Sequence, residues 1–172
     1  SKKAVLDRVQ IWNILGCEFM IHFKNKRKED FAVVADFSAA DILISNQEDF
    51  AVQRAARDLR DDFKRLGAKS PQIYNQPSQL QKERVIIITS AAEVNNFDFI
   101  NRSDREKITQ LKGKWESFII KNIDLRLLSS KQRKEAIIIA GSDIRGTIYG
   151  IYELSREMGV SPWYWWADVP VE

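Results

Sequence analysis

Short apolar runs along the chain predict strands, and the residue types in the runs indicate how deeply each strand is buried. The runs at 85–88 and 137–139 are continuous Val and Ile, which is typical of strands buried on both faces of a sheet. Residues 115–123 alternate instead, with Phe118 and Ile120 against Ile119 and Lys121, which predicts a strand near a sheet edge. Further apolar runs predict strands at 19–23 and 31–37, and a strand or the lead into the next element at 41–44.

Two longer stretches have the three-and-four spacing of an amphipathic helix. The first begins at one of residues 45–47 and ends near Leu66, before Gly67. Phe50 is among its apolar positions, and Asp62 is among the alternating acids and bases expected on the solvent side. The second follows the strand at 137–139, begins after a cap at Ser142 or Asp143, and ends at Gly159. A shorter helical pattern lies within 95–112, with Ser103 as its cap and Ile108 and Leu111 as apolar points.

Strands that alternate with helices predict an α/β (α+β) fold, a mixed β-sheet with helices packed on it. With 172 residues, the chain has the size of a single domain, 1–172. Hydrophobic residues make up 44% of it and charged residues 30%, as in ordinary globular proteins, and no apolar segment has the length of a membrane span. The net charge of only +3 does not indicate nucleic acid as a partner, and the basic run 24–28 is interpreted as a solvated loop.

The sequence indicates no metal and no cofactor. Cys17 is the single cysteine, which excludes an internal disulfide and a cysteine-based metal cluster, and His22 is the single histidine, within a predicted strand. Ser90 follows a predicted central strand, but it has neither a glycine-rich surround nor a partner base, so a nucleophile is not favoured. No phosphate-binding loop or dinucleotide fingerprint is present.

Two glycines mark the helix that starts at Ile144. On a helical wheel, Ile144, Thr147, Ile148, Ile151, Leu154, Ser155 and Met158 form the stripe expected to face the sheet. Gly146 and Gly150 lie on the opposite side, and each costs about 1 kcal/mol relative to alanine. We therefore expect a second body to approach the outer face of this helix at the two glycines. Arg145 and Tyr149 lie on the flank of the helix, between its two faces.

An aromatic run follows this helix. Trp163, Tyr164, Trp165 and Trp166 are consecutive, and an extended segment containing Asp168 leads to Pro170. Four neighbouring rings cannot all point into the core of a small domain, so some are expected to face a partner, a ligand or a continuation of the chain.

These residues carry a family resemblance. The run GSDIRGTIYGIYELSREMGVSPWYWWADVPV, together with GKWESFIIKNID at 113–124, resembles the N-terminal domain of glycoside hydrolase family 115, the xylan α-glucuronidases. The resemblance covers nearly all of the chain, although 46–105 matches only in pattern. It implies an accessory domain like those that precede the catalytic (β/α)8 barrel in hexosaminidase and α-glucuronidase families, with 160–172 as the exit segment toward that barrel.

The resemblance also implies a function for the parent enzyme. That enzyme would be secreted or periplasmic and would release glucuronic or 4-O-methylglucuronic acid from xylan, with its own barrel as this domain's partner. Inverting hydrolysis needs two carboxyl groups around the scissile bond, and no such pair stands out among the 24 acidic residues, so we expect this fragment to be inactive. The alternatives are a free-standing carbohydrate-binding module and a protein-interaction module.

The candidate site residues each have two interpretations. Asp143 is a weak catalytic candidate or a helix cap. Arg145 could hold an anion such as glucuronate or pair with a carboxylate of the barrel, and the second is favoured. The run Trp163–Trp166 could stack on sugar rings or pack at the domain joint, which is favoured, and Asp168 fits either arrangement.

Overall fold

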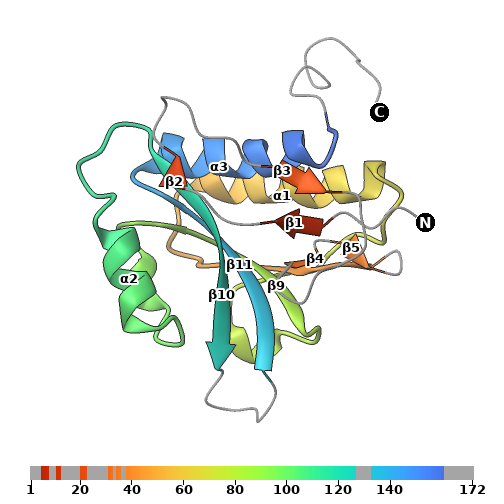
Figure 1. Ribbon diagram of the computed structural model, residues 1–172, viewed down its shortest axis with the longest axis horizontal. Coiled ribbons are helices and arrows are strands. Elements are labelled where there is room, and N and C mark those ends of the chain that lie inside the picture. Colours follow the sequence, from red (N-terminus) through yellow and green to blue (C-terminus); the bar gives the residue numbers. More distant parts are fainter. Residues whose placement is uncertain are drawn as a thin grey trace.

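The protein is a mixed β-sheet covered by helices on both faces (Figure 1). The computed structural model describes residues 38–126 and 133–160, and the strand residues 5–7, 11–12, 20–22, 31–32 and 34–35. The elements are β1 (Val5–Asp7), β2 (Ile11–Trp12), β3 (Met20–His22), β4 (Phe31–Ala32), β5 (Val34–Ala35), β6 (Ser38–Ala39), β7 (Asp41–Ile44), α1 (Phe50–Arg65), β8 (Ile73–Tyr74), η1 (Pro77–Gln79), β9 (Arg84–Ser90), η2 (Val94–Asn96), α2 (Arg102–Thr109), β10 (Phe118–Arg126), β11 (Arg133–Gly141) and α3 (Ile144–Glu157).

The main sheet has six strands in the order β2-β10-β11-β9-β7-β8. Strands β8, β7, β9 and β11 run parallel, whereas β10 is antiparallel to β11 and β2 is antiparallel to β10. The two continuous apolar runs pair at the centre, with Ile137 opposite Ile86 and Ile139 opposite Ile88. The expected mixed sheet, with its most apolar strands innermost, is confirmed.

Each face of this sheet has its own apolar core because side chains alternate along a strand. Ile42, Ile86, Ile88, Ile137 and Ile139 point to the face covered by α1 and α3. Leu43, Ile87 and Ile138 point to the other face, where Ile108 and Leu111 of the α2 region pack against them. Helices α1 and α3 lie side by side on the first face (Figure 1).

The first helix departs from its predicted pattern at two positions. It begins at Phe50, later than the expected start at 45–47, because Asp49 caps it by accepting a hydrogen bond from the Ala51 N–H. Gly67, at φ +76°, follows its end as expected. Phe50 was placed on the buried stripe but is 72% exposed, because it is the first residue of the helix and lies beyond the sheet. Asp62 was placed on the solvent side but is buried, because α3 covers it.

The glycines of α3 face the chain's own sheet, so the expected approach of a second body at this point is wrong. Gly146 and Gly150 are both buried. A Cβ on Gly146 would stand 2.4 Å from the Ser117 carbonyl oxygen, and one on Gly150 would stand 2.8 Å from a methyl of Ile139. The buried face of α3 is therefore rotated toward its glycines, and this rotation leaves Ile144 44% exposed.

Two smaller differences concern element ends. Asn101, not Ser103, caps α2, because its side chain accepts from the Asp104 N–H at 2.9 Å. The run predicted as one strand over 31–37 contains the separate strands β4 and β5. Strand β4 joins β1 and β3 in a three-stranded sheet that includes His22, and β5 pairs with β6.

Some expectations fall outside the described residues. Cys17, the loop 24–30 and the run from Trp163 to Asp168 all lie there, and their predictions stay predictions. Among the described helices, none has the length and apolarity that crossing a membrane requires.

Candidate functional site

The candidate site is the edge of the sheet at which β7, β9 and β11 end, which we call the carboxyl edge. It comprises residues 45–50, 90–96, 115–117 and 141–145, together with Tyr149. The loop before β10 belongs to this edge because β10 is antiparallel, so that Phe118 pairs with Gly141. Helix α1 leaves β7 toward one face and the α2 segment leaves β9 toward the other. Adjacent strands whose connections diverge in this way form the usual ligand-binding crevice of an α/β sheet.

Glu48 fills the gap between the ends of β7 and β9. It is buried, and its Oε1 accepts a hydrogen bond of 2.7 Å from the Ser90 N–H. Burial raises the pKa of the Glu48 carboxyl, against the lowering effect of hydrogen bonds from Ser90 and Thr89. Glu48 thus joins the two loops, and Ser90 serves as a donor to it through its backbone.

Polar side chains around Glu48 bond to one another. Asn96 Nδ2 donates to Gln47 Oε1 at 3.3 Å and to Glu93 Oε2 at 2.5 Å. Asn75, which follows β8, donates to Asn46 Oδ1 at 3.0 Å. These amides and carboxylates are exposed or half-buried, and they connect the loops after three strands of the sheet.

Asp143 holds the start of α3 to the loop before β10. Its Oδ1 accepts from the Gly146 N–H at 2.7 Å and its Oδ2 from the Glu116 N–H at 3.0 Å. Ser117 and Ser142 add two hydrogen bonds, of 2.8 and 2.9 Å, between the same loops. Both oxygens of Asp143 are engaged in the fold, which is the capping role that the sequence also allowed; a catalytic role for Asp143 gains no support from this arrangement.

Arg145 finds its ionic partner within this domain. Its Nη1 lies 2.9 Å from Glu116 Oε1, and its Nη2 donates to the Tyr149 hydroxyl at 3.0 Å. The Tyr149 hydrogen bond and then the Glu116 charge raise the pKa of the guanidinium. The argument for a partner carboxylate outside the chain therefore loses its basis, although the Arg145 side chain remains 63% exposed.

Glu116 adopts a backbone conformation that is uncommon for a residue with a side chain. Its φ is +47°, the left-handed region that disfavours residues other than glycine. The Asp143 bond to its N–H and the Arg145 bond to its carboxylate hold it there, and Trp115 beside it is left 75% exposed. Sequence reasoning missed Trp115 and Glu116 as site residues, although both stand in the GKWES stretch that resembles the family.

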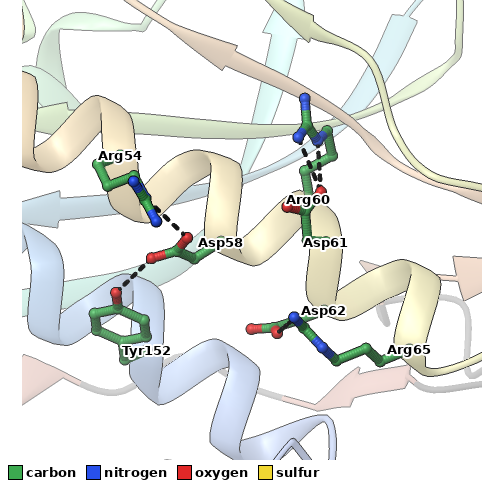
Figure 2. Close-up of polar contacts among 7 residues, drawn as sticks. All are labelled: Arg54, Asp58, Arg60, Asp61, Asp62, Arg65 and Tyr152. Carbon is green, nitrogen blue, oxygen red and sulfur yellow. Dashed lines mark hydrogen bonds and ion pairs between the residues drawn. The ribbon is translucent and has the colours of Figure 1, made fainter. Parts of the chain in front are cut away.

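A second polar cluster lies between α1 and α3, away from this edge (Figure 2). Tyr152 donates to Asp58 Oδ2 at 2.8 Å, and burial followed by this bond raises the pKa of Tyr152 to about 12. Asp62 is 1% exposed, and its Oδ1 accepts from Arg65 at 2.6 Å. Burial raises the pKa of Asp62, whereas nearby Ser155 and Arg65 lower it.

This helix interface is structural, because its buried or half-buried carboxylates already have partners in the fold: Asp58 pairs with Tyr152 and Arg54, and Asp62 pairs with Arg65. Neither Ser155 Oγ nor Asp62 Oδ2 makes a hydrogen bond of good geometry among the described residues. Within the same part of the chain, three or more His, Cys, Asp or Glu side chains do not gather as a metal site would require. The carboxyl edge remains the candidate, with aromatic, cationic and hydrogen-bonding groups on a rigid frame.

The fold and this edge define a small α/β domain with a rigid, amphipathic edge. Neither the models of known protein families nor the curated proteins give a match to the sequence. Among solved structures, the chain is similar to a family GH115 4-O-methyl-α-glucuronidase, BtGH115A, described as specific for decorated arabinogalactans. The similarity has 29% identity and a TM-score of 0.53, and it covers 78% of this chain and 16% of that chain. The chain is thus similar to a domain of a GH115 enzyme and spans about one sixth of its length.

Proposed function

We propose that this chain is a non-catalytic accessory domain of a longer glycoside hydrolase of the GH115 type. The observation that carries the proposal is the similarity over most of this chain to a small part of a much longer α-glucuronidase. The carboxylates at the carboxyl edge agree with it. Glu48, Glu116 and Asp143 each hold the fold together through the bonds described above, and none is arranged as an acid with a free base across a cleft.

The reaction of the whole enzyme would be release of glucuronic or 4-O-methylglucuronic acid from a plant polysaccharide. The resemblance in the sequence favours xylan as that polysaccharide, whereas the similar solved enzyme is named for decorated arabinogalactans. Polymers such as xylan and arabinogalactan meet their hydrolases outside the cytoplasm, so the proposal includes a secreted or periplasmic location. The domain would stabilise the catalytic barrel and contribute residues to the rim of its active-site pocket.

Uronic acid release tests this division of labour. The full-length gene product and the 172-residue chain are each incubated with glucuronoxylan and with arabinogalactan, and free uronic acid is measured. We expect release by the full-length protein and none by the chain alone. Turnover by the chain alone would refute the accessory role, and inactivity of the full-length protein on both polymers would refute the hydrolase assignment.

A free-standing carbohydrate-binding module is the second candidate. The exposed indole of Trp115 favours it, because aromatic faces stack on the C–H faces of sugars. Titration of xylo-oligosaccharides into the 172-residue chain, followed by tryptophan fluorescence, distinguishes the two. Saturable binding that disappears in Trp115→Ala would favour the module.

A further inference from the structure

Among the residues that the structure describes, the large hydrophobic side chains that remain exposed all lie at the carboxyl edge. They are Phe50 at 72%, Trp115 at 75%, Ile144 at 44% and Tyr149 at 40%. Phe50 and Ile144 are the first residues of α1 and α3, Tyr149 is in the second turn of α3, and Trp115 is in the loop before β10. Because α1 and α3 follow the parallel strands β7 and β11, both helices begin at the same edge (Figure 1).

We propose that the carboxyl edge is a docking surface for the rest of the longer polypeptide, with these four side chains as its apolar centre. This inference rests on the proposed function and specifies which surface of the domain meets its neighbour. It differs from the expectation based on Gly146 and Gly150, which the chain's own sheet covers. Exposed apolar residues gathered on one side of a small domain, and surrounded by polar groups, mark an interaction site.

The composition of the edge favours a protein as the occupant. Trp, Tyr, Phe and Arg are enriched at the centres of protein interfaces, and Ile144 adds an aliphatic side chain that sugar stacking does not use. Arg145 is already neutralised by Glu116, so a neighbour can cover the guanidinium without supplying a carboxylate. The polar group of Asn46, Gln47, Glu93 and Asn96 then forms the rim.

The frame of the edge is rigid enough for docking without large rearrangement. Asp143 ties the Trp115 loop to α3 by two backbone bonds, and Glu48 ties the loop after β7 to the end of β9. Preorganised side chains lose less conformational entropy on association. The occupant follows from length: the similar domain is 16% of its enzyme's chain, so most of that polypeptide is available as a neighbour.

Hydroxyl-radical footprinting tests the docking surface directly. Phe50 and Trp115 should oxidise on the order of fivefold more slowly in the full-length protein than in the 172-residue chain, because a protein interface excludes solvent. Leu66, half-buried at the other end of α1, is the internal control and should oxidise equally in both. Equal rates at Phe50 and Trp115 in an active full-length enzyme would overturn the docking surface while leaving the proposed function standing.

Other occupants give other outcomes. Protection of Trp115 in the 172-residue chain on addition of glucuronoxylan, with none in the full-length protein, would overturn the proposal in favour of a sugar site. Protection that depends on the concentration of the chain alone would favour a second copy. The mass of the natural gene product is a further test. A gene product no longer than this chain would refute both the proposed function and the docking surface.

A double variant supplies a second test. Phe50→Ser with Trp115→Ser should leave the melting temperature of the 172-residue chain nearly unchanged, since both side chains are exposed in it. In the full-length protein, the same variant should separate the melting of this domain from that of the remainder in calorimetry. Gln81→Ser, exposed before β9 at the opposite edge, is the matched control and should not separate them. One common transition in the full-length double variant would contradict the docking surface.

Discussion

Helices α1 and α3 cover the same face of the sheet, but the first two turns of α3 approach it through glycines where α1 uses large side chains. Helix α1 fills its contact with Val52, Leu59 and Phe63, all fully buried. Helix α3 presents Gly146 and Gly150 at the corresponding place, where the Ser117 carbonyl and Ile139 leave no room for a Cβ. The difference shows that one face of a sheet can hold one helix by volume and another by close backbone approach.

The comparison also explains why hydrophobic periodicity predicts the buried side of α1 more completely than that of α3. Large apolar residues at helical spacing identify the buried side of α1, apart from the end residue Phe50. In α3, Thr147, Ile151 and Leu154 of the predicted stripe are buried as expected, but the buried side also includes two residues without side chains, and the stripe residue Ile144 is exposed. Substitutions in the two helices should therefore destabilise the domain for different reasons, a cavity at α1 and overpacking at α3.

Phe63→Ala should give the largest loss. It removes a fully buried ring from the α1 side and should lower the free energy of unfolding of the 172-residue chain by about 3–5 kcal/mol. Urea denaturation followed by circular dichroism measures this. Phe50→Ala, a matched change at an exposed position of the same helix, should cost far less. Similar losses in both variants would contradict the assigned burial.

Gly146→Leu should give the next largest loss. A side chain here meets the backbone carbonyl of Ser117, a residue that two hydrogen bonds tie to Ser142, and overpacking costs about 1–3 kcal/mol. If a second body contacted these glycines, Gly146→Leu would leave the isolated domain stably folded and impair only its assembly. The observed contact predicts the reverse, a loss of stability in the isolated domain. Denaturation of the isolated variant decides between them, with Ala51→Leu on exposed α1 surface as the control.

Tyr152→Phe should cost about 1 kcal/mol, the usual net value of one hydrogen bond. It removes the donor to Asp58 across the α1–α3 interface while keeping the ring (Figure 2). Tyr149→Phe in the same helix removes a hydroxyl that serves only the exposed Arg145, and it should be nearly neutral. A larger loss in Tyr149→Phe than in Tyr152→Phe would reverse our ranking of the two contacts.

Asp62→Asn should have the smallest net effect at neutral pH, because the lost charge on the Arg65 bond and the relieved burial of a carboxylate oppose each other. Its signature is the pH dependence. The folded-state pKa of Asp62 is raised, so its contribution to stability is present at low pH and is lost as pH rises through that pKa. The stability of the Asp62→Asn variant, relative to the wild type, should therefore be higher near neutral pH than at about pH 4, where more of the wild-type carboxyl is protonated. Denaturation of the wild type and the variant at both pH values measures this, with Asp61→Asn, a change at an exposed carboxylate of the same helix, as the matched control.

Much of the fold follows from the sequence because its signals are local. Continuous runs of valine and isoleucine predict β9 and β11, and three-and-four spacing predicts α1. The cap of α3 is predicted to be Ser142 or Asp143, and it is Asp143. The direction in which α3 presents its glycines depends on Ser117, which lies 29 residues earlier in the chain, and no local pattern reports that contact. The fold class is confirmed, whereas the burial of individual positions at helix ends is not predictable from periodicity.

The candidate site was predicted less completely for the same reason. Asp143, Arg145 and Tyr149 were identified from one helix, but Glu116 and Trp115 join them through tertiary hydrogen bonds. Glu48 meets Ser90 across 42 residues of sequence, in a loop whose composition is unremarkable. Sites assembled from the ends of several strands are visible only when the strand order is known.

The position of β11 constrains how this protein can be made. It is the penultimate element of the described chain, yet it lies between β10 and β9 near the middle of the sheet. During synthesis on the ribosome, β9 and β10 emerge first and must wait with open hydrogen-bonding edges until Gly141 has left the exit tunnel. Nascent chains stalled before that residue should therefore depend on chaperones, and a stop codon upstream of it would yield an aggregating product rather than a shorter domain.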